Sequence, residues 1–144
     1  MALFIFSAAR EMLALGSIEQ HYSFDQAEAA EKRQDFKAAE QLYREAIERM
    51  EHRHEPYLRL AEVLIKLKHP IEAAEEMQKA LDRVEDIDAR ARFSFRLADI
   101  LEAGGEGNQS MQALNQIREE AKGKKYENYA VERIERATGT KKNP

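Results

Sequence analysis

The chain has 144 residues, of which 35% are charged, and its 23 basic and 27 acidic side chains give a net charge of −4. This balance argues against nonspecific nucleic-acid binding, which requires a clustered positive surface. The absence of cysteine excludes disulfides, thiolate metal ligands and cysteine nucleophiles, and it suits a reducing, cytoplasmic location.

The chain opens with an apolar stretch, residues 1–17, that includes Leu3, Phe4, Ile5 and Phe6. A secretory signal would need positive residues ahead of this stretch, and a membrane-spanning helix would need roughly 20 apolar residues. We therefore expect an amphipathic helix that packs on the rest of the chain. Three alternatives stay open, namely an oligomerisation contact made by residues 3–6, a helix lying on a membrane surface, and a disordered end.

Capping signals divide residues 18–87 into four helices. Ser17 with Gln20 resembles a capping box before a helix at 18–33, and Asp35 can cap the helix that follows. Pro56 falls in the first turn of the third helix, where its missing N–H is not needed. The His69-Pro70 pair opens the fourth helix, with the histidine as its cap.

Three more helices are predicted after residue 87. The first ends at the Gly104-Gly105 pair, and Asn108 is the expected cap of the second, which ends near Gly123. The last covers residues 126–137 and is closed by Gly139, which leaves a frayed tail at 139–144. No stretch alternates with a period of two, so no strand is expected.

Small residues recur along these helices at a regular spacing. At an offset of 34 residues, Ala27, Ala39, Tyr43 and Ala46 fall opposite Ala61, Ala73, Met77 and Ala80. A looser third copy, shifted by 37, has Ala98, Ser110, Leu114 and Ile117 at the same places. Small residues where helices cross, at this period, indicate a helix–turn–helix array. The copies cover about residues 20–53, 54–87 and 91–123 of a repeat region at 18–123, and a capping helix follows at 124–138.

Two segments carry a resemblance to a known family. Residues 34–47, with Ala39, Tyr43 and Ala46, and residues 69–81, with Ala73 and Ala80, resemble the second helix of a tetratricopeptide repeat. The resemblance implies an all-α fold, a right-handed α-solenoid of antiparallel helix pairs. It also implies that a protein or peptide segment binds in a concave groove, and it says nothing about chemistry.

In this family the first helix of each repeat lines the groove, and projection from Ala27, Ala61 and Ala98 gives its expected lining. The residues are Phe24, Glu28, Leu58, Arg59, Glu62, Lys66, Arg92, Phe95, Arg96 and Asp99.

Three of these residues, Arg59, Arg92 and Arg96, would converge on one surface, where guanidinium groups suit an acidic partner or a C-terminal carboxylate. This resembles part of the carboxylate clamp of some family members, although Phe24 and Glu28 stand where the clamp's first basic and amide residues would be. The alternative is that the arginines pair with Glu62 and Asp99 across neighbouring helices and hold the array together.

Other polar residues give no catalytic or metal site. His52 and His54 lie in a short corner with no further ligand at a suitable spacing, so a solvated turn is expected. The many glutamates fall on polar helix faces, and no nucleophile motif, phosphate loop or dinucleotide fingerprint is present. We therefore expect no catalytic residues, no cofactor and no bound metal.

The sequence thus predicts a non-catalytic adaptor or scaffold that binds a protein or peptide segment, with no nucleic-acid partner and no membrane contact. Two other functions stay open. The chain could be a homo-oligomeric structural protein that assembles through Leu3, Phe4, Ile5 and Phe6. It could also be an assembly factor held at a membrane surface by the same residues.

Overall fold

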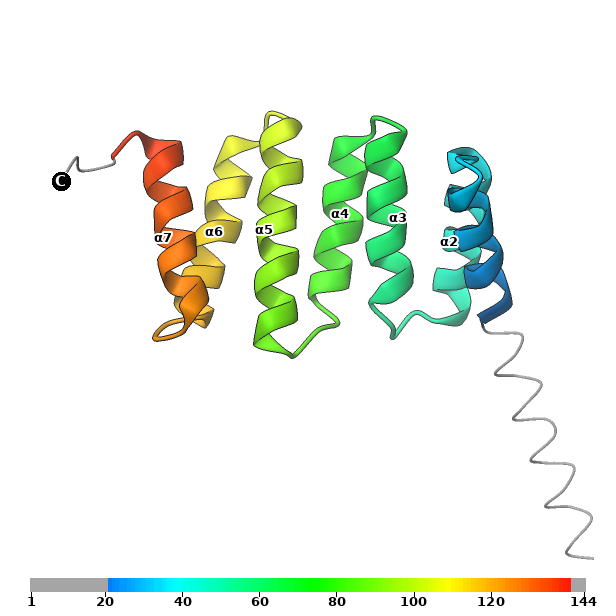
Figure 1. Ribbon diagram of the computed structural model, residues 1–144, viewed down its shortest axis with the longest axis horizontal. Coiled ribbons are helices and arrows are strands. Elements are labelled where there is room, and N and C mark those ends of the chain that lie inside the picture. Colours follow the sequence, from blue (N-terminus) through cyan, green and yellow to red (C-terminus); the bar gives the residue numbers. More distant parts are fainter. Residues whose placement is uncertain (1–20, 141–144) are drawn as a thin grey trace, which may run out of the picture.

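The computed structural model describes residues 21–140, and every regular element in that range is an α-helix. A helical segment, residues 21–32, comes first. It is followed in chain order by α2 (Phe36–Arg49), α3 (Glu55–Lys66), α4 (Pro70–Leu81), α5 (Ile87–Ala103), α6 (Gly107–Glu120) and α7 (Lys125–Thr138). Figure 1 shows these helices side by side in one row, with α2 and α7 at opposite ends.

The helices pack in two layers. Each helix packs chiefly on its neighbours in the chain, from α2 through to α7. Ion pairs join segment 21–32 to α3, α3 to α5, and α5 to α7, so these four helices form the first layer. Helices α2, α4 and α6 form the second layer, in which Arg44 of α2 reaches Glu72 of α4 at 3.3 Å. The predicted all-α array of antiparallel helices is confirmed.

Small residues sit where the layers meet, as their spacing predicted. The fully buried alanines of the repeated positions are Ala27, Ala39, Ala46, Ala61, Ala73, Ala80 and Ala98. The larger residues that align at the same repeat spacing are also fully buried, namely Tyr43, Met77 and Leu114. Alternating small and large side chains let neighbouring helices approach closely without leaving a void.

Three corners between the layers share one backbone conformation. Gln34, Lys68 and Gly105 have φ angles of 61°, 65° and 83°. In each case the next N–H bonds to a carbonyl five residues back, as in Asp35 to Ala30 at 3.0 Å. This is the Schellman turn that ends many helices. The left-handed region costs ordinary L-residues roughly 1–2 kcal/mol, so Gln34 and Lys68 hold a strain that the glycine avoids.

Side-chain caps begin two of the helices. Asp35 accepts a hydrogen bond from the Ala38 N–H at 3.2 Å, which confirms the predicted start of α2. Asp86 accepts one from the Ala89 N–H at 2.8 Å at the start of α5. His69 occupies the cap position of α4, but its side chain makes no capping hydrogen bond.

The predicted cap at Asn108 is wrong, because α6 begins at Gly107 with Glu106 in the cap position. The turn at Gly105 sets this start, since it delivers the Glu106 N–H to the Leu101 carbonyl at 2.8 Å. Asn108 therefore lies inside the helix and not at its cap position.

Several predictions fall on residues outside the described range. These are the apolar helix at 1–17 with Leu3, Phe4, Ile5 and Phe6, the capping box at Ser17 and Gln20, and the last four residues of the tail.

Candidate functional site

Ion pairs cross the first-layer face from one helix to the next. Arg96 of α5 donates two hydrogen bonds to Glu62 of α3, with N–O distances of 2.8 and 2.6 Å. Arg133 of α7 lies 2.7 Å from Asp99 of α5 and 3.3 Å from Glu102. The hydrogen bonds to Glu62 raise the pKa of Arg96 further above its ordinary value, so this guanidinium stays charged.

A third pair completes the series at the other end of the face. Arg59 of α3 donates to Glu28 of segment 21–32 at 3.0 Å, and it lies 3.8 Å from Glu31. Glu31 in turn accepts a hydrogen bond from the buried Tyr43 hydroxyl at 2.8 Å. Burial and this bond to a carboxylate both raise the pKa of Tyr43, which remains neutral. We call the pairs Glu28–Arg59, Glu62–Arg96 and Asp99–Arg133 the ion-pair ladder.

The ladder matters more for shape than for bulk stability. Its side chains are partly exposed, apart from Arg133, which is 12% exposed. Exposed ion pairs contribute between about 0 and 1 kcal/mol, and the two-bond geometry places Glu62–Arg96 near the upper end. Each pair fixes the spacing between successive first-layer helices, so the ladder sets the shape of the face that a partner would meet.

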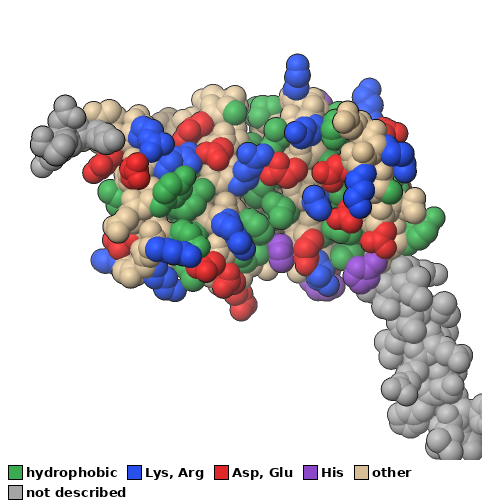
Figure 2. All heavy atoms as spheres, viewed as in Figure 1, with side chains coloured by type: hydrophobic (Ala, Val, Ile, Leu, Met, Phe, Trp, Pro, Cys, Tyr) green, Lys and Arg blue, Asp and Glu red, His purple; other side chains and the backbone are tan. Residues whose placement is uncertain are grey.

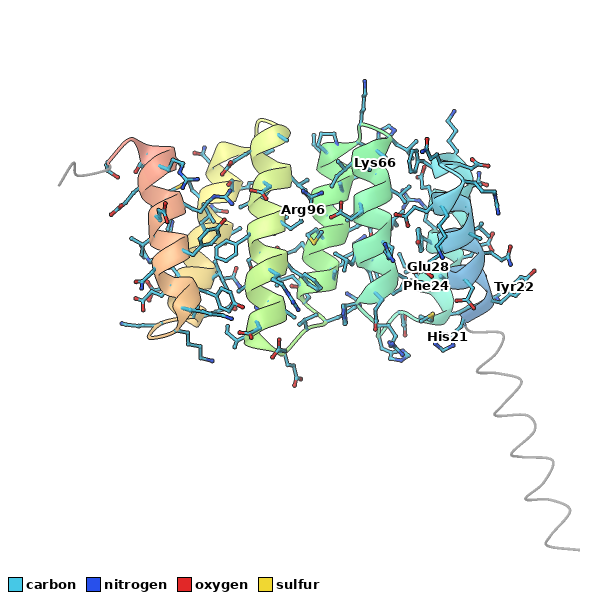
Figure 3. The ribbon with its side chains drawn as sticks, viewed as in Figure 1. His21, Tyr22, Phe24, Glu28, Lys66 and Arg96 are labelled. Atoms are coloured by element: carbon cyan, nitrogen blue, oxygen red, sulfur yellow. The ribbon has the colours of Figure 1, made fainter. Side chains whose placement is uncertain are left out.

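All ten predicted groove residues lie on first-layer helices. The half-buried ones are Phe24, Glu28, Leu58, Glu62, Phe95 and Arg96, and the exposed ones are Arg59, Lys66, Arg92 and Asp99. Figure 3 labels Phe24 and Glu28 on segment 21–32, Lys66 on α3 and Arg96 on α5.

The three arginines expected to converge have different surroundings. Arg59 and Arg96 both belong to the ladder, Arg59 with Glu28 and Arg96 with Glu62. The pairing with Glu62 was expected under the alternative in which the arginines hold the array together. Asp99 pairs with Arg133, not with one of the three arginines. Within residues 21–140, Arg92 has neither a hydrogen-bond nor an ion-pair partner, and the same holds for Lys66.

An aromatic cluster lies next to Arg92 and was not predicted. The ring of Phe95, one turn after Arg92 on α5, contacts the ring of Tyr129 edge-on at 4.6 Å between centroids. Tyr126 lies 6.4 Å from Phe95, and the Lys125 ammonium sits 4.6 Å above the Tyr126 ring. Tyr129 is 46% exposed. We call Arg92, Phe95, Lys125, Tyr126 and Tyr129 the aromatic–cationic patch.

Helix α7 therefore takes part in the first-layer face, whereas only a capping helix was predicted there. The missed signal was the spacing of the ladder arginines. Arg133 follows Arg96 by 37 residues, which is the spacing between Arg96 and Arg59. That repetition aligns α7 with α5 and α3 and would have placed Tyr129 beside Phe95.

Two hollows open on the first-layer face. One of about 440 Å³ is lined by Asp99, Glu102, Tyr129, Arg133, Arg136 and Ala137, next to the aromatic–cationic patch. A smaller one of about 150 Å³ is lined by Glu28, Glu31, Lys32 and Arg59 at the other end of the face. Figure 2 shows blue and red side chains intermixed along the array, with green hydrophobic side chains exposed between them.

Of the two histidines in the corner before α3, His52 is exposed and His54 has protein partners. His54 lies 5.6 Å from the Phe93 ring between centroids and 3.7 Å from the Glu55 carboxylate. Across the described residues, no cluster of three or more His, Asp or Glu side chains is placed to hold a metal ion. None of the helices between residues 21 and 140 is long and apolar enough to cross a membrane.

The family model described as tetratricopeptide repeat matches residues 30–92. A search of curated proteins found no significant match. Among solved structures, the N-terminal domain of stress-induced protein-1 (STI-1) from C. elegans matches with a TM-score of 0.73 and 19% identity, over 85% of this chain and 97% of that chain. The TPR2B domain of yeast Sti1, in its complex with pHsp70, matches with a TM-score of 0.64 and 19% identity, over 86% of this chain and 99% of that chain. The predicted tetratricopeptide resemblance and fold are confirmed.

Proposed function

We propose that this chain is a non-catalytic adaptor that binds a protein segment across its first-layer face, at the aromatic–cationic patch. Tetratricopeptide domains are in general protein–protein interaction modules, and one of the similar structures is a complex, that of the yeast Sti1 TPR2B domain with pHsp70. The fold supports the general role. The place and chemistry of binding are argued from the residues of this chain.

The observation that carries the proposal is an aromatic surface beside an unpaired cation. Phe95 and Tyr126 are half-buried and Tyr129 is exposed, so their rings form a preformed apolar surface on two neighbouring helices. Aromatic side chains gain much contact area on binding and lose little conformational freedom. Arg92 stands one turn from Phe95 and is free to form an ion pair with a ligand.

The charges of the ladder define which ligand fits. The carboxylates of Glu28, Glu62 and Asp99 are already neutralised by their arginines. Among the ten predicted groove residues, the charges left without a partner within the described residues are those of Arg92 and Lys66, and both are positive. A segment that carries an apolar or aromatic anchor next to acidic groups matches this pattern.

A peptide selection with defined variants tests the proposal. Random peptides displayed on phage are selected on the full chain, and the enriched sequences are made as fluorescent peptides and titrated by anisotropy. We expect enrichment of acidic residues next to an aromatic or aliphatic one. The Arg92→Glu, Tyr129→Ala variant should weaken binding by about tenfold or more.

Lys37 provides a matched control, since it is an exposed cation on α2 in the second layer. Lys37→Glu changes the net charge as much as Arg92→Glu does, and it should leave the affinity unchanged. Circular dichroism of each variant confirms that the helices are retained. Selected peptides whose affinity is the same for all variants would refute the proposed site.

A further inference from the structure

A groove on the second-layer face is not used by the proposed function. It lies between α4 and α6, has a volume of about 530 Å³, and is floored by α5. Its apolar lining consists of Ile71, Ala74, Leu97, Leu101 and Ala113. Ile71 is 59% exposed, which makes it one of the most exposed large hydrophobic side chains among the described residues. A groove of this size lies within the range of sites that take apolar side chains.

Much of the rim of the groove is formed by glutamines. Gln78, Gln109, Gln112 and Gln116 contribute to it. Helix α6 carries no charged side chain from Gly107 to Ile117, in a chain of which 35% is charged. Three of these glutamines donate hydrogen bonds to nearby carboxylates: Gln78 to Asp82, Gln109 to Glu106 and Gln116 to Glu120. Gln112 is exposed and has no partner within the described residues.

Three charged residues, Glu75, Lys79 and Glu106, also line the groove, and Glu75 is exposed with no partner within the described residues. Lys79 pairs with the buried Glu76 at 2.8 Å, and Glu106 accepts a hydrogen bond from Gln109 at 3.1 Å. The groove thus presents an apolar floor and an uncharged α6 side with amide donors and acceptors, while the carboxylates of Glu75 and Glu106 stand at its edges. An uncharged apolar segment is the occupant that would lose the least solvation there.

The chain itself contains such a segment. Residues 2–9 carry no charged side chain and include Leu3, Phe4, Ile5 and Phe6. They lie outside the described range. We propose that the groove between α4 and α6 binds residues 2–9 of a second copy of this chain.

The position of the described N-terminal end favours a second copy over the same copy. The described chain begins at residue 21, in the first layer beside α2 (Figure 1). The groove lies in the second layer and beyond α4, so a segment of the same copy would have to pass both α2 and α4. A contact between unlike surfaces of two copies leaves one free segment and one free groove, and each can bind a further copy.

Sedimentation of the full chain over a concentration series tests the proposal. The average mass should rise above that of one copy as concentration increases. Two variants should each remain at the mass of one copy. The first, Phe4→Asp with Phe6→Asp, changes the segment, and the second, Ile71→Glu with Gln112→Glu, changes exposed residues of the groove.

Tyr22→Glu with Gln41→Glu is the matched control, because it changes an exposed apolar residue and an exposed glutamine that do not line the groove. It should associate as the unmodified chain does. The control shows that added charge alone does not prevent association.

Mixing the two non-associating variants gives the sharpest result. The groove variant retains its segment and the segment variant retains its groove, so an equimolar mixture should form a complex of two copies and grow no further. The proposal is overturned if the full chain keeps the mass of one copy at every concentration, if the groove variant still associates, or if the mixture does not. Peptide binding at the aromatic–cationic patch should be unaffected by the groove variant, so the two proposals fail separately.

Discussion

Breaking the Glu62–Arg96 pair should loosen the link between α3 and α5. The guanidinium makes two hydrogen bonds to one carboxylate, and the two side chains are 32% and 42% exposed. Replacing either residue by glutamine removes one charge and keeps most of the side-chain packing. The remaining partner then reaches solvent, so each single change should cost little.

The magnitude of the interaction follows from this exposure. Exposed pairs measured by double-mutant cycles give about 0.2–1 kcal/mol, and parallel two-bond geometry favours the upper half of that range. We therefore expect a coupling energy of about 0.5–1 kcal/mol between Glu62→Gln and Arg96→Gln. Salt should reduce it strongly, because the Debye length falls from about 10 Å at 0.1 M to about 3 Å at 1 M.

Urea denaturation of the original chain, the two single variants and the double variant measures this coupling. Arg118 and Glu119 form the control pair, since they are adjacent on α6, lie 3.0 Å apart and link no two helices. Their cycle should give a coupling close to zero. A Glu62–Arg96 coupling no larger than that of the control, or one that salt leaves unchanged, would refute the role assigned to the ladder.

Three further predictions concern the fold and its corners. Ala73→Leu adds volume at a fully buried position and should lower the unfolding free energy by about 1–3 kcal/mol in denaturant titrations. Lys68→Gly relieves a φ of 65° at an exposed corner and should raise the unfolding free energy by about 1 kcal/mol. An unchanged unfolding free energy would mean that this corner holds no strain. The bonds from Arg53 lower the pKa of Glu55 to about 2, so its contribution to stability is present above its ordinary pKa and is lost as pH falls toward 2. Carboxylate NMR should show this midpoint, and Arg53→Ala should return it toward the ordinary value.

The regular spacing of small residues was enough to predict the helices and their packing. Alanines such as Ala39 and Ala73 recur at 34 residues because each helix pair repeats the same close crossing. The same spacing would have corrected the wrong cap at Asn108. The cap positions of α2, α4 and α6 are Asp35, His69 and Glu106, which follow one another by 34 and 37 residues. The backbone turn before each of these helices determines where the helix begins, and the preference of asparagine for cap positions does not override it.

The candidate site could be predicted only in part. Helical projection places Arg59, Arg92 and Arg96 on first-layer helices, but it cannot say which of them a neighbouring carboxylate has already engaged. That depends on the offset between adjacent helices, which pairs Arg96 with Glu62 and leaves Arg92 free. The contribution of Tyr129 was missed because α7 lacks the alanine pattern of the other repeats.

The central claim is that the first-layer face binds a segment at the aromatic–cationic patch, and chemical-shift mapping tests it most directly. A peptide selected on the full chain is titrated into isotopically labelled protein, and backbone amide shifts are followed by NMR. We expect the largest changes along one side of α5 and α7, around Arg92, Phe95 and Tyr129. Changes confined to α4 and α6, or spread evenly over the second layer, would contradict the claim.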